Sequence, residues 1–267
     1  MFALPFALAG ALFVGMDNPG WAILGWIALA MAGARSLAMA LNRLIDAQID
    51  ARNPRTAGRE IPSGRLSRRQ VWAFSVASLG ALLVAVSQLA RPTWYLWLVP
   101  VALFVAYPYA KRVTWLCHLV LGVTIGIAPV GAWIAVDGSL AWTPVLLGLA
   151  VAAWIAGFDI IYALLDVDFD RAHGVHSFPA RFGPIVALRA TRCLHALAIA
   201  LLVSAGLTAG AGWPYGVGVA VCAVILLVEN LTVDAKRPDR INVAFNHANM
   251  ILSGVFAAAV IAEVTLR

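Results

Sequence analysis

The chain is a succession of apolar segments, each about as long as a bilayer is thick, separated by short polar turns. A helix needs about twenty apolar residues to cross a bilayer. Only 12% of the residues are charged and 62% are hydrophobic, whereas about 25% charged residues are usual in a soluble domain. We therefore predict an all-α, polytopic membrane protein with about nine transmembrane helices. The predicted spans are residues 1–15, 20–45, 69–90, 94–110, 114–136, 142–165, 184–208, 213–231 and 242–264.

The segments follow one another without a linker or a low-complexity stretch, so we predict a single domain over residues 1–267. The cysteines are scattered through apolar segments and form no CxxC pair, which disfavours a disulfide framework or a zinc site. The first segment is short, because Asp17 follows soon after Met1. We expect this helix to be truncated at its start or to enter the bilayer late.

Basic residues gather in alternate turns. The turns around residues 17–20, 91–92, 137–139 and 210–214 carry almost no positive charge. The basic loops contain Arg43, Arg52, Arg55, Arg59, Arg65, Arg68 and Arg69, then Lys111 and Arg112, then Arg171 and Arg181, and finally Lys236, Arg237 and Arg240. Such one-sided loops are typical of the cytoplasmic face. The net charge of +6 is therefore interpreted as a topology signal, and we expect no nucleic-acid partner.

Two ladders of polar side chains end the second and the sixth segments. Their members are Asn42, Asp46 and Asp50 in the first, and Asp159, Tyr162, Asp166 and Asp170 in the second. Residues three or four apart share one face of a helix. Both ladders are predicted at the cytoplasmic ends of their helices, where they can face each other.

Carboxylates in this arrangement predict a site for a divalent metal and a polyanion. Magnesium prefers oxygen ligands, and two facing ladders can hold it through the oxygens of a diphosphate. A single aspartate at a helix end is more often an interfacial residue, but that explanation is poor for two aligned ladders. An ion-coupled transporter also buries carboxylates, although it is expected to spread them across the bilayer. The DGxxAR-type motif of CDP-alcohol phosphotransferases is absent from the sequence.

The pair of motifs NxxxDxxxD and DxxYxxxDxxxD resembles the UbiA superfamily of intramembrane aromatic prenyltransferases. Residues 2–8 and 53–67 look like the first helix and the first cytoplasmic loop of that family. Residues 107–112 and 126–133 are similar to its bacterial 4-hydroxybenzoate polyprenyltransferases. The resemblance covers essentially the whole chain, and it implies a central cavity that opens to the cytoplasm. Family members carry further residues before the first helix, as its short length here suggests.

The resemblance also implies roles for individual residues. The proposed Mg²⁺ ligands are Asp46, Asp50, Asp166 and Asp170, with Asp159 and Tyr162 as the catalytic residues of the reaction chamber. The residues implied in substrate binding are Asn42, Arg35, Arg55, Lys111 and Arg112. Some alternatives stay open. Asn42 binds diphosphate or orders its ladder, Arg55 binds diphosphate or orders its loop, and Arg35 binds an acceptor carboxylate or pairs with Asp159. His118 is interpreted as a hydrogen-bonded histidine between helices.

By this resemblance the chain is expected to transfer a polyprenyl group from polyprenyl diphosphate to an aromatic acid for quinone biosynthesis, with Mg²⁺ as cofactor. The favoured acceptor is 4-hydroxybenzoate, and a 1,4-dihydroxynaphthoate for menaquinone is the nearest alternative. The expected location is the bacterial inner membrane, with the active site on the cytoplasmic side. The isoprenoid substrate is too apolar to leave the bilayer, which explains why the enzyme is embedded in it.

Overall fold

The computed structural model describes the chain apart from residues 1–3, 15–18, 235–236, 238–240, 242–247 and 267. Every regular element in the described part is a helix, which confirms the predicted all-α class. The helices are α1 (Leu4–Leu12), α2 (Trp21–Arg52), α3 (Arg68–Ser87), α4 (Thr93–Leu96), α5 (Leu98–Ala110), α6 (Cys117–Asp137), α7 (Trp142–Ala163), η1 (Leu164–Asp166), α8 (Val167–His173), α9 (Phe178–Phe182), α10 (Pro184–Ala209), α11 (Trp213–Thr232) and α13 (Asn249–Thr265).

Local sequence signals explain where several helices begin and end. Ser67 and Gln70 form a reciprocal capping box that starts α3, in which each side chain accepts a hydrogen bond from the other's backbone N–H. Gly138 ends α6 with a φ of 76°, and Gly174 ends α8 with a φ of 67°. Residues with a Cβ adopt this left-handed conformation at a cost, so glycine suits both ends.

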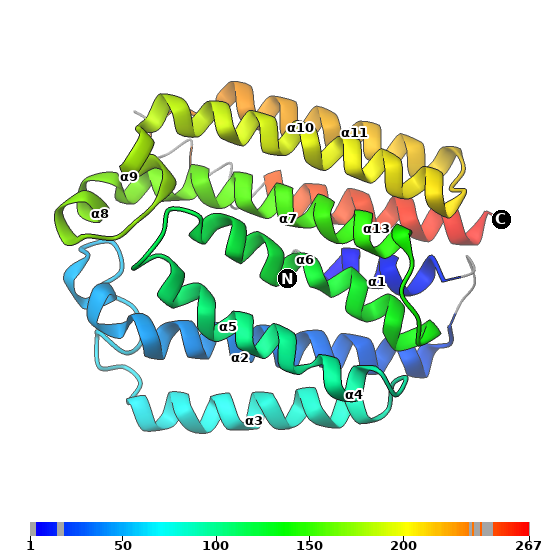
Figure 1. The fold of residues 1–267 in the computed structure, drawn as a ribbon, viewed down its shortest axis with the longest axis horizontal. Helices are drawn as coiled ribbons and strands as arrows, with labels where there is room; N and C mark the ends of the chain where they lie inside the picture. The colour runs from blue at the N-terminus through cyan, green and yellow to red at the C-terminus, as the bar shows by residue number, and fades with distance from the viewer. Residues whose placement is uncertain (1–3, 15–18, 235–236, 238–240, 242–247, 267) are drawn as a thin grey trace.

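The most buried helix is α7, which packs between α6 and α10 (Figure 1). Small residues allow α6 and α7 to approach closely. A Cβ added to Gly126 of α6 would lie 2.4 Å from the carbonyl oxygen of Gly148 on α7, and one added to Gly122 would lie 2.3 Å from that of Ala152. Close backbone approach at small residues is the usual way in which membrane helices gain packing energy. The contact fixes α7, and with it the second ladder.

Large apolar side chains cover much of the outside of the bundle, among them Tyr95, Leu207, Trp213 and Leu231, which are all at least 70% exposed. Within the described residues, seven helices or helix runs are long and apolar enough to cross a membrane. The chain is therefore a multi-pass membrane protein. The helices α1 and α13 are shorter, and part of the ninth predicted span lies outside the described residues, so the count of nine spans stays a prediction.

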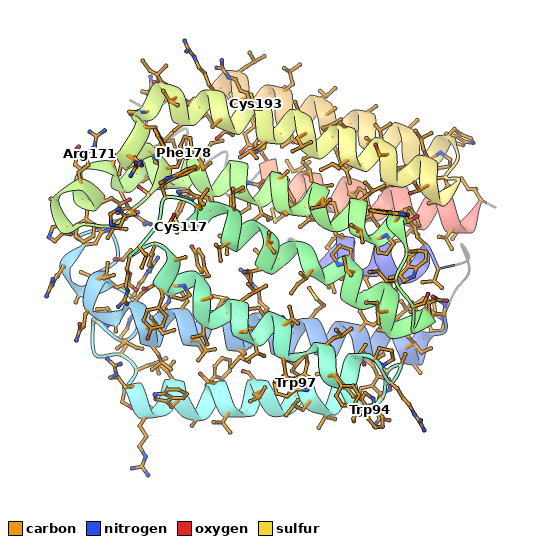
Figure 2. All side chains as sticks on the ribbon, in the orientation of Figure 1. Trp94, Trp97, Cys117, Arg171, Phe178 and Cys193 are labelled. Carbon is orange, nitrogen blue, oxygen red and sulfur yellow. The ribbon has the colours of Figure 1, made fainter. Side chains whose placement is uncertain are left out.

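The loops with the predicted site residues lie at one end of the bundle. Figure 1 shows the α2–α3 loop, the α5–α6 turn and helices α8 and α9 together at this end. In Figure 2, Cys117, Arg171 and Phe178 mark the same end, while Trp94 and Trp97 lie toward the opposite end. Among the turns that the structure describes, the basic and neutral ones thus alternate between the two ends of the molecule.

Candidate active site

The first ladder follows the last turns of α2. Asp46 is completely buried and Asp50 is 4% exposed. The side-chain amide of Asn42 donates a hydrogen bond to Asp46 Oδ2 at 3.0 Å, one helical turn away. This contact joins Asn42 to its own ladder, and a role of Asn42 in binding diphosphate stays a prediction. At the end of the helix, Thr56 Oγ1 donates to the carbonyl oxygen of Asp50 at 3.0 Å and draws the next loop against it.

The second ladder does not lie on one continuous helix face, which corrects the prediction from spacing. Helix α7 ends at Ala163, a 3₁₀ turn spans Leu164–Asp166, and α8 begins at Val167. A 3₁₀ turn has three residues per turn, so it rotates later side chains relative to an α-helix. Asp170 is nevertheless buried, while Asp168 is exposed on α8. The tighter turn changes the direction of Asp166 relative to Tyr162.

Residues of the α2–α3 loop connect the two ladders. Arg55 holds Asp166 with two guanidinium nitrogens: Nε donates to Oδ1 at 2.8 Å, and Nη2 forms an ion pair with Oδ2. Arg55 Nη1 also donates to the hydroxyl oxygen of Tyr162 at 2.7 Å. Asn53 Nδ2 donates to Asp166 Oδ1 at 2.9 Å. The α2–α3 loop, which follows the first ladder, therefore contacts Tyr162 and Asp166 of the second.

Electrostatics favour the charged form of Arg55. Burial alone lowers the pKa of its guanidinium, but the hydrogen bond and the negative charge of Asp166 outweigh burial and raise the pKa above its ordinary value. A planar guanidinium that binds a carboxylate through two nitrogens can bind a phosphate in the same way. The Arg55 side chain is 30% exposed, so an incoming anion can reach it.

Three more cations neutralise the first ladder. Lys111 Nζ forms an ion pair with Asp46 Oδ2, and Arg112 Nη2 lies 3.5 Å from Asp46 Oδ1. Arg112 also donates to the carbonyl oxygen of Ile45 at 2.7 Å. Arg59 Nη1 pairs with Asp50 Oδ1 at 2.7 Å. The mouth of the site is defined here as the two ladders with Arg55, Arg59, Lys111 and Arg112, and its carboxylates and cations lie in direct contact.

An apolar cavity of about 590 Å³ extends from this mouth into the bundle. Its polar lining includes Arg35, Asn42, Arg59, Asp159 and Tyr162. Its apolar lining includes Met31, Leu82, Trp97, Phe104, Ile125 and Phe158. Its lining also includes Leu89 and Thr93, which flank the neutral turn at residues 91–92, so the cavity extends from the mouth toward the other end of the bundle. One compartment thus joins a charged opening to a long apolar interior.

Arg35 does not pair with Asp159, which was one of its two predicted roles. Instead, Asp159 Oδ2 lies 2.6 Å from His118 Nδ1 on α6. Within the described residues, Arg35 forms no ion pair and lines the cavity with its cation. An arginine inside a membrane protein is costly unless an anion or water solvates it. Because α6 supplies the partner of Asp159, Arg35 remains available to an anionic ligand.

Sequence reasoning missed three members of the site and underrated a fourth. Asn53 and Arg59 bind the ladders from the loop, and their nearness to Asp50 in the sequence was the available signal. Tyr107 lines the cavity from α5, and no local pattern marks it. His118 is a hydrogen-bonded histidine between helices, as expected, but its partner turned out to be the predicted catalytic residue Asp159.

Magnesium fits this mouth as a companion of diphosphate. In the described part of the chain, no three His, Cys, Asp or Glu side chains converge closely enough to hold a metal ion. Mg²⁺ is usually bound by one or two carboxylates and completes its shell with water and phosphate oxygens. Asp50 Oδ2 is buried and has no hydrogen-bond partner. The four aspartates therefore suit an ion that arrives with the oxygens of its substrate.

The fold and the site define a class of proteins: helical, multi-pass membrane proteins in which a charged mouth opens into an apolar cavity. Comparison with known sequences then identifies the family. The family model of the UbiA prenyltransferases matches residues 3–254. The chain belongs to the UbiA prenyltransferase family, as its two aspartate motifs predict, and this membership makes it a transferase.

Individual relatives agree with this assignment. The chain is 30% identical over 247 residues to 4-hydroxybenzoate octaprenyltransferase of Cupriavidus necator, which covers 91% of this chain and 85% of the relative. It is 32% identical over 225 residues to the mitochondrial 4-hydroxybenzoate polyprenyltransferase of Aedes aegypti. That alignment covers 82% of this chain and spans only 50% of the mitochondrial protein.

Solved structures share the fold. The apo structure of a UbiA homologue from Aeropyrum pernix K1 matches with a TM-score of 0.90 and 33% identity, over 98% of this chain and 96% of the homologue. A UbiA homologue from Archaeoglobus fulgidus, solved with DMAPP and Mg²⁺, matches with a TM-score of 0.75 over 100% of this chain and 95% of that one. Its identity is 20%, so this likeness concerns the fold alone.

Proposed function

We propose that this chain transfers a polyprenyl group from polyprenyl diphosphate to a ring carbon of 4-hydroxybenzoate and releases diphosphate. The observation that carries the proposal is the pair of facing ladders, joined by Arg55 and Asp166 at the opening of an apolar cavity. A prenyl diphosphate has the same two parts, a highly charged head and a long apolar tail. The whole chain, residues 1–267, serves as one domain in this activity.

The mouth binds the diphosphate. The side chains that contact the diphosphate are Arg55, Lys111 and Arg112, which exchange their carboxylate partners for phosphate oxygens. Asp46, Asp50, Asp166 and Asp170 hold Mg²⁺, and Asn42 keeps the first ladder in place. The metal supplies Lewis-acid stabilisation of the negative charge on the leaving diphosphate when it is bound. The oxygen ligands of these carboxylates suit Mg²⁺, which prefers oxygen donors.

The cavity binds the prenyl chain and the aromatic acceptor. The chain extends along apolar residues such as Phe104 and Trp97. The acceptor lies near the mouth, where the cation of Arg35 pairs with its carboxylate and Asp159 and Tyr162 face its ring. Both 4-hydroxybenzoate and 1,4-dihydroxynaphthoate carry such a carboxylate, so Arg35 does not separate them. The names of the relatives favour 4-hydroxybenzoate and hence a role in ubiquinone biosynthesis.

The reaction is an electrophilic aromatic substitution. The bond between C1 of the prenyl group and the diphosphate oxygen breaks, and its electron pair leaves with the diphosphate. The ring carbon ortho to the hydroxyl group donates a π pair to C1 and forms the new C–C bond. The proton on that ring carbon leaves to a base, and its C–H pair restores aromaticity. Arg55 and Lys111 stabilise the negative charge of the leaving group, while the apolar walls keep water from the carbocation.

The positive-inside rule supports a position of this mouth on the cytoplasmic side of a bacterial inner membrane, because the loops around it are basic. Polyprenyl diphosphate enters from the bilayer and the aromatic acid from the cytoplasm. An ion-coupled transporter is a poorer explanation, because the ladder carboxylates Asp46, Asp50 and Asp166 gather at one end of the bundle around paired cations.

The test uses the purified full chain in detergent with geranyl diphosphate, Mg²⁺ and a panel of acceptors that includes 4-hydroxybenzoate and 1,4-dihydroxy-2-naphthoate. We expect mass spectrometry to detect C-prenylated 4-hydroxybenzoate and stoichiometric diphosphate, both lost when EDTA is added. Prenylation of the naphthoate alone would overturn the choice of acceptor. Absence of any prenylated product with the whole panel would overturn the proposed function.

A further inference from the structure

His118 lies in the first turn of α6 and reaches the second ladder from the side. Its side chain is only 5% exposed, whereas that of Asp159 is 17% exposed and lines the cavity. The two side chains meet at 2.6 Å between His118 Nδ1 and Asp159 Oδ2. A contact this short indicates a hydrogen bond in which a partner is charged, since such bonds are shorter than neutral ones.

The other ring nitrogen of His118 indicates which tautomer contacts Asp159. The backbone N–H of Phe178 donates to His118 Nε2 at 3.1 Å. An imidazolium has no acceptor nitrogen, so a ring that accepts here is neutral and carries its proton on Nδ1. The contact with Asp159 is therefore an N–H donated to a carboxylate, which leaves Asp159 as the anion.

The segment that holds Phe178 is itself anchored to the mouth. The backbone N–H of His176 donates to the carbonyl oxygen of Lys111 at 2.7 Å, and Cys117 Sγ donates to that of His176 at 3.4 Å. The ring of Phe178 packs edge-on against Trp115 at 5.6 Å between centroids. Cys117 and Phe178 lie at the same end of the bundle in Figure 2. His118 is thus held on one side by a fixed backbone and holds Asp159 on the other.

We propose that His118 is a positioning residue that keeps the Asp159 carboxylate ionised and aimed into the cavity, where Asp159 accepts a hydrogen bond from the acceptor's phenolic hydroxyl. This rests on the proposed function. A hydroxyl bound to an anion is a stronger electron donor to its ring, so the ortho carbon attacks C1 faster. Hydrogen-bond partners that orient a functional group in this way typically change activity by about 10–100-fold.

The experiment compares four variants of the full chain in detergent: His118→Leu, His118→Gln, Asp159→Asn and the double variant His118→Leu/Asp159→Asn. A glutamine amide can donate to Asp159 and accept from Phe178, so it keeps both contacts, whereas leucine keeps neither. His176→Leu is the matched control, because this exposed histidine of the neighbouring loop contributes only backbone hydrogen bonds in the described structure. The readouts are kcat with 4-hydroxybenzoate, KM for geranyl diphosphate, and Mg²⁺-dependent binding of geranyl diphosphate.

We expect His118→Leu to lower kcat by about 10–100-fold with an unchanged KM for geranyl diphosphate, and His118→Gln to retain near-native kcat. In the Asp159→Asn background, His118→Leu should cause no further loss, because both changes remove one interaction. Three results would overturn the proposal. The first is a native kcat in His118→Leu, and the second is a loss in the double variant equal to the product of the two single losses. The third is a loss of geranyl diphosphate binding in His118→Leu as large as its loss of kcat. If the leucine variant does not fold, the glutamine variant decides alone, since its inactivity contradicts the proposal. A wild-type chain that transfers nothing overturns the proposed function first.

Discussion

Arg55 and Asp166 lie 111 residues apart in the sequence, and two guanidinium nitrogens of Arg55 bind the Asp166 carboxylate. This ion pair joins the second ladder to the α2–α3 loop, which follows the first ladder. The same guanidinium bonds the hydroxyl of Tyr162 and lies 4.8 Å from the centre of its ring. One residue thus joins α2's loop to the end of α7. In the proposed reaction it exchanges a carboxylate for a phosphate, which makes it the most informative cation to change.

Replacing Arg55 with lysine should raise the KM for geranyl diphosphate by about tenfold, the effect of losing roughly 1.4 kcal/mol of binding, because lysine cannot form two parallel hydrogen bonds. Steady-state kinetics of diphosphate release measures this change. The control is Arg52→Lys, since Arg52 is exposed at the end of α2 and forms no ion pair among the described residues. Equal effects of the two variants would contradict a specific role of Arg55.

The stabilising contribution of the Arg55 charge should be independent of pH across the neutral range. The folded-state pKa of Arg55 is raised by Asp166. A cation whose pKa is raised on folding stabilises the fold fully at any pH below the ordinary arginine pKa. Its contribution is lost only as the pH rises through the folded-state pKa. The difference in melting temperature between wild type and Arg55→Gln should therefore be constant from about pH 6 to pH 9, far below the ordinary value. A difference that shrinks within this range would refute the assignment.

Arg35 should recognise the acceptor carboxylate. The variant Arg35→Leu is expected to raise the KM for 4-hydroxybenzoate by about 10–100-fold, a loss typical of a charge-assisted hydrogen bond, while the KM for geranyl diphosphate stays the same. The matched substrate is 4-hydroxybenzamide, which lacks the negative charge and should react equally poorly with both proteins. If the variant loses activity equally with the acid and the amide, Arg35 has a structural role instead.

The close contact of α6 and α7 should be sensitive to a single methyl group. Gly126→Ala places a Cβ 2.4 Å from a carbonyl oxygen of the backbone of α7. We expect a loss of about 1–3 kcal/mol in the free energy of unfolding, as for other overpacked cores. Thermal unfolding in detergent can compare it with Gly80→Ala on α3, where nothing lies within 4 Å of the added atom. Similar melting temperatures for both variants would show that the helices can separate without cost.

Periodicity predicted more of this molecule than any single motif did. The apolar segments located the long helices, and the spacing of Asp46 and Asp50 placed them together on α2, because α2 is one regular helix through both residues. The same argument was less accurate for Tyr162 and Asp166. The 3₁₀ turn between them depends on how α8 folds back toward the mouth, and a local pattern does not contain that information.

Which charged residues contact each other could also not be predicted without the fold. Arg35 and Asp159 each lie inside an apolar segment. An unpaired charge there is energetically costly, so the sequence favours an ion pair between them. The structure instead brings His118 of α6 against Asp159, because α6 and α7 touch closely at small residues such as Gly122. Arg59 illustrates the same limit, since its nearness to Asp50 in the sequence is shared by other arginines of the basic loop, and only the fold shows that Arg59 binds Asp50.

The central claim is that the two ladders act together on a magnesium diphosphate. The most direct measurement is Mg²⁺-dependent diphosphate release from geranyl diphosphate with 4-hydroxybenzoate, for Asp46→Asn, Asp166→Asn and the control Asp168→Asn, whose residue is exposed on α8. We expect about a 100-fold or greater loss for each ladder variant, as for removal of other groups that stabilise a leaving anion, and a native rate for the control. Native rates in either ladder variant would contradict the account.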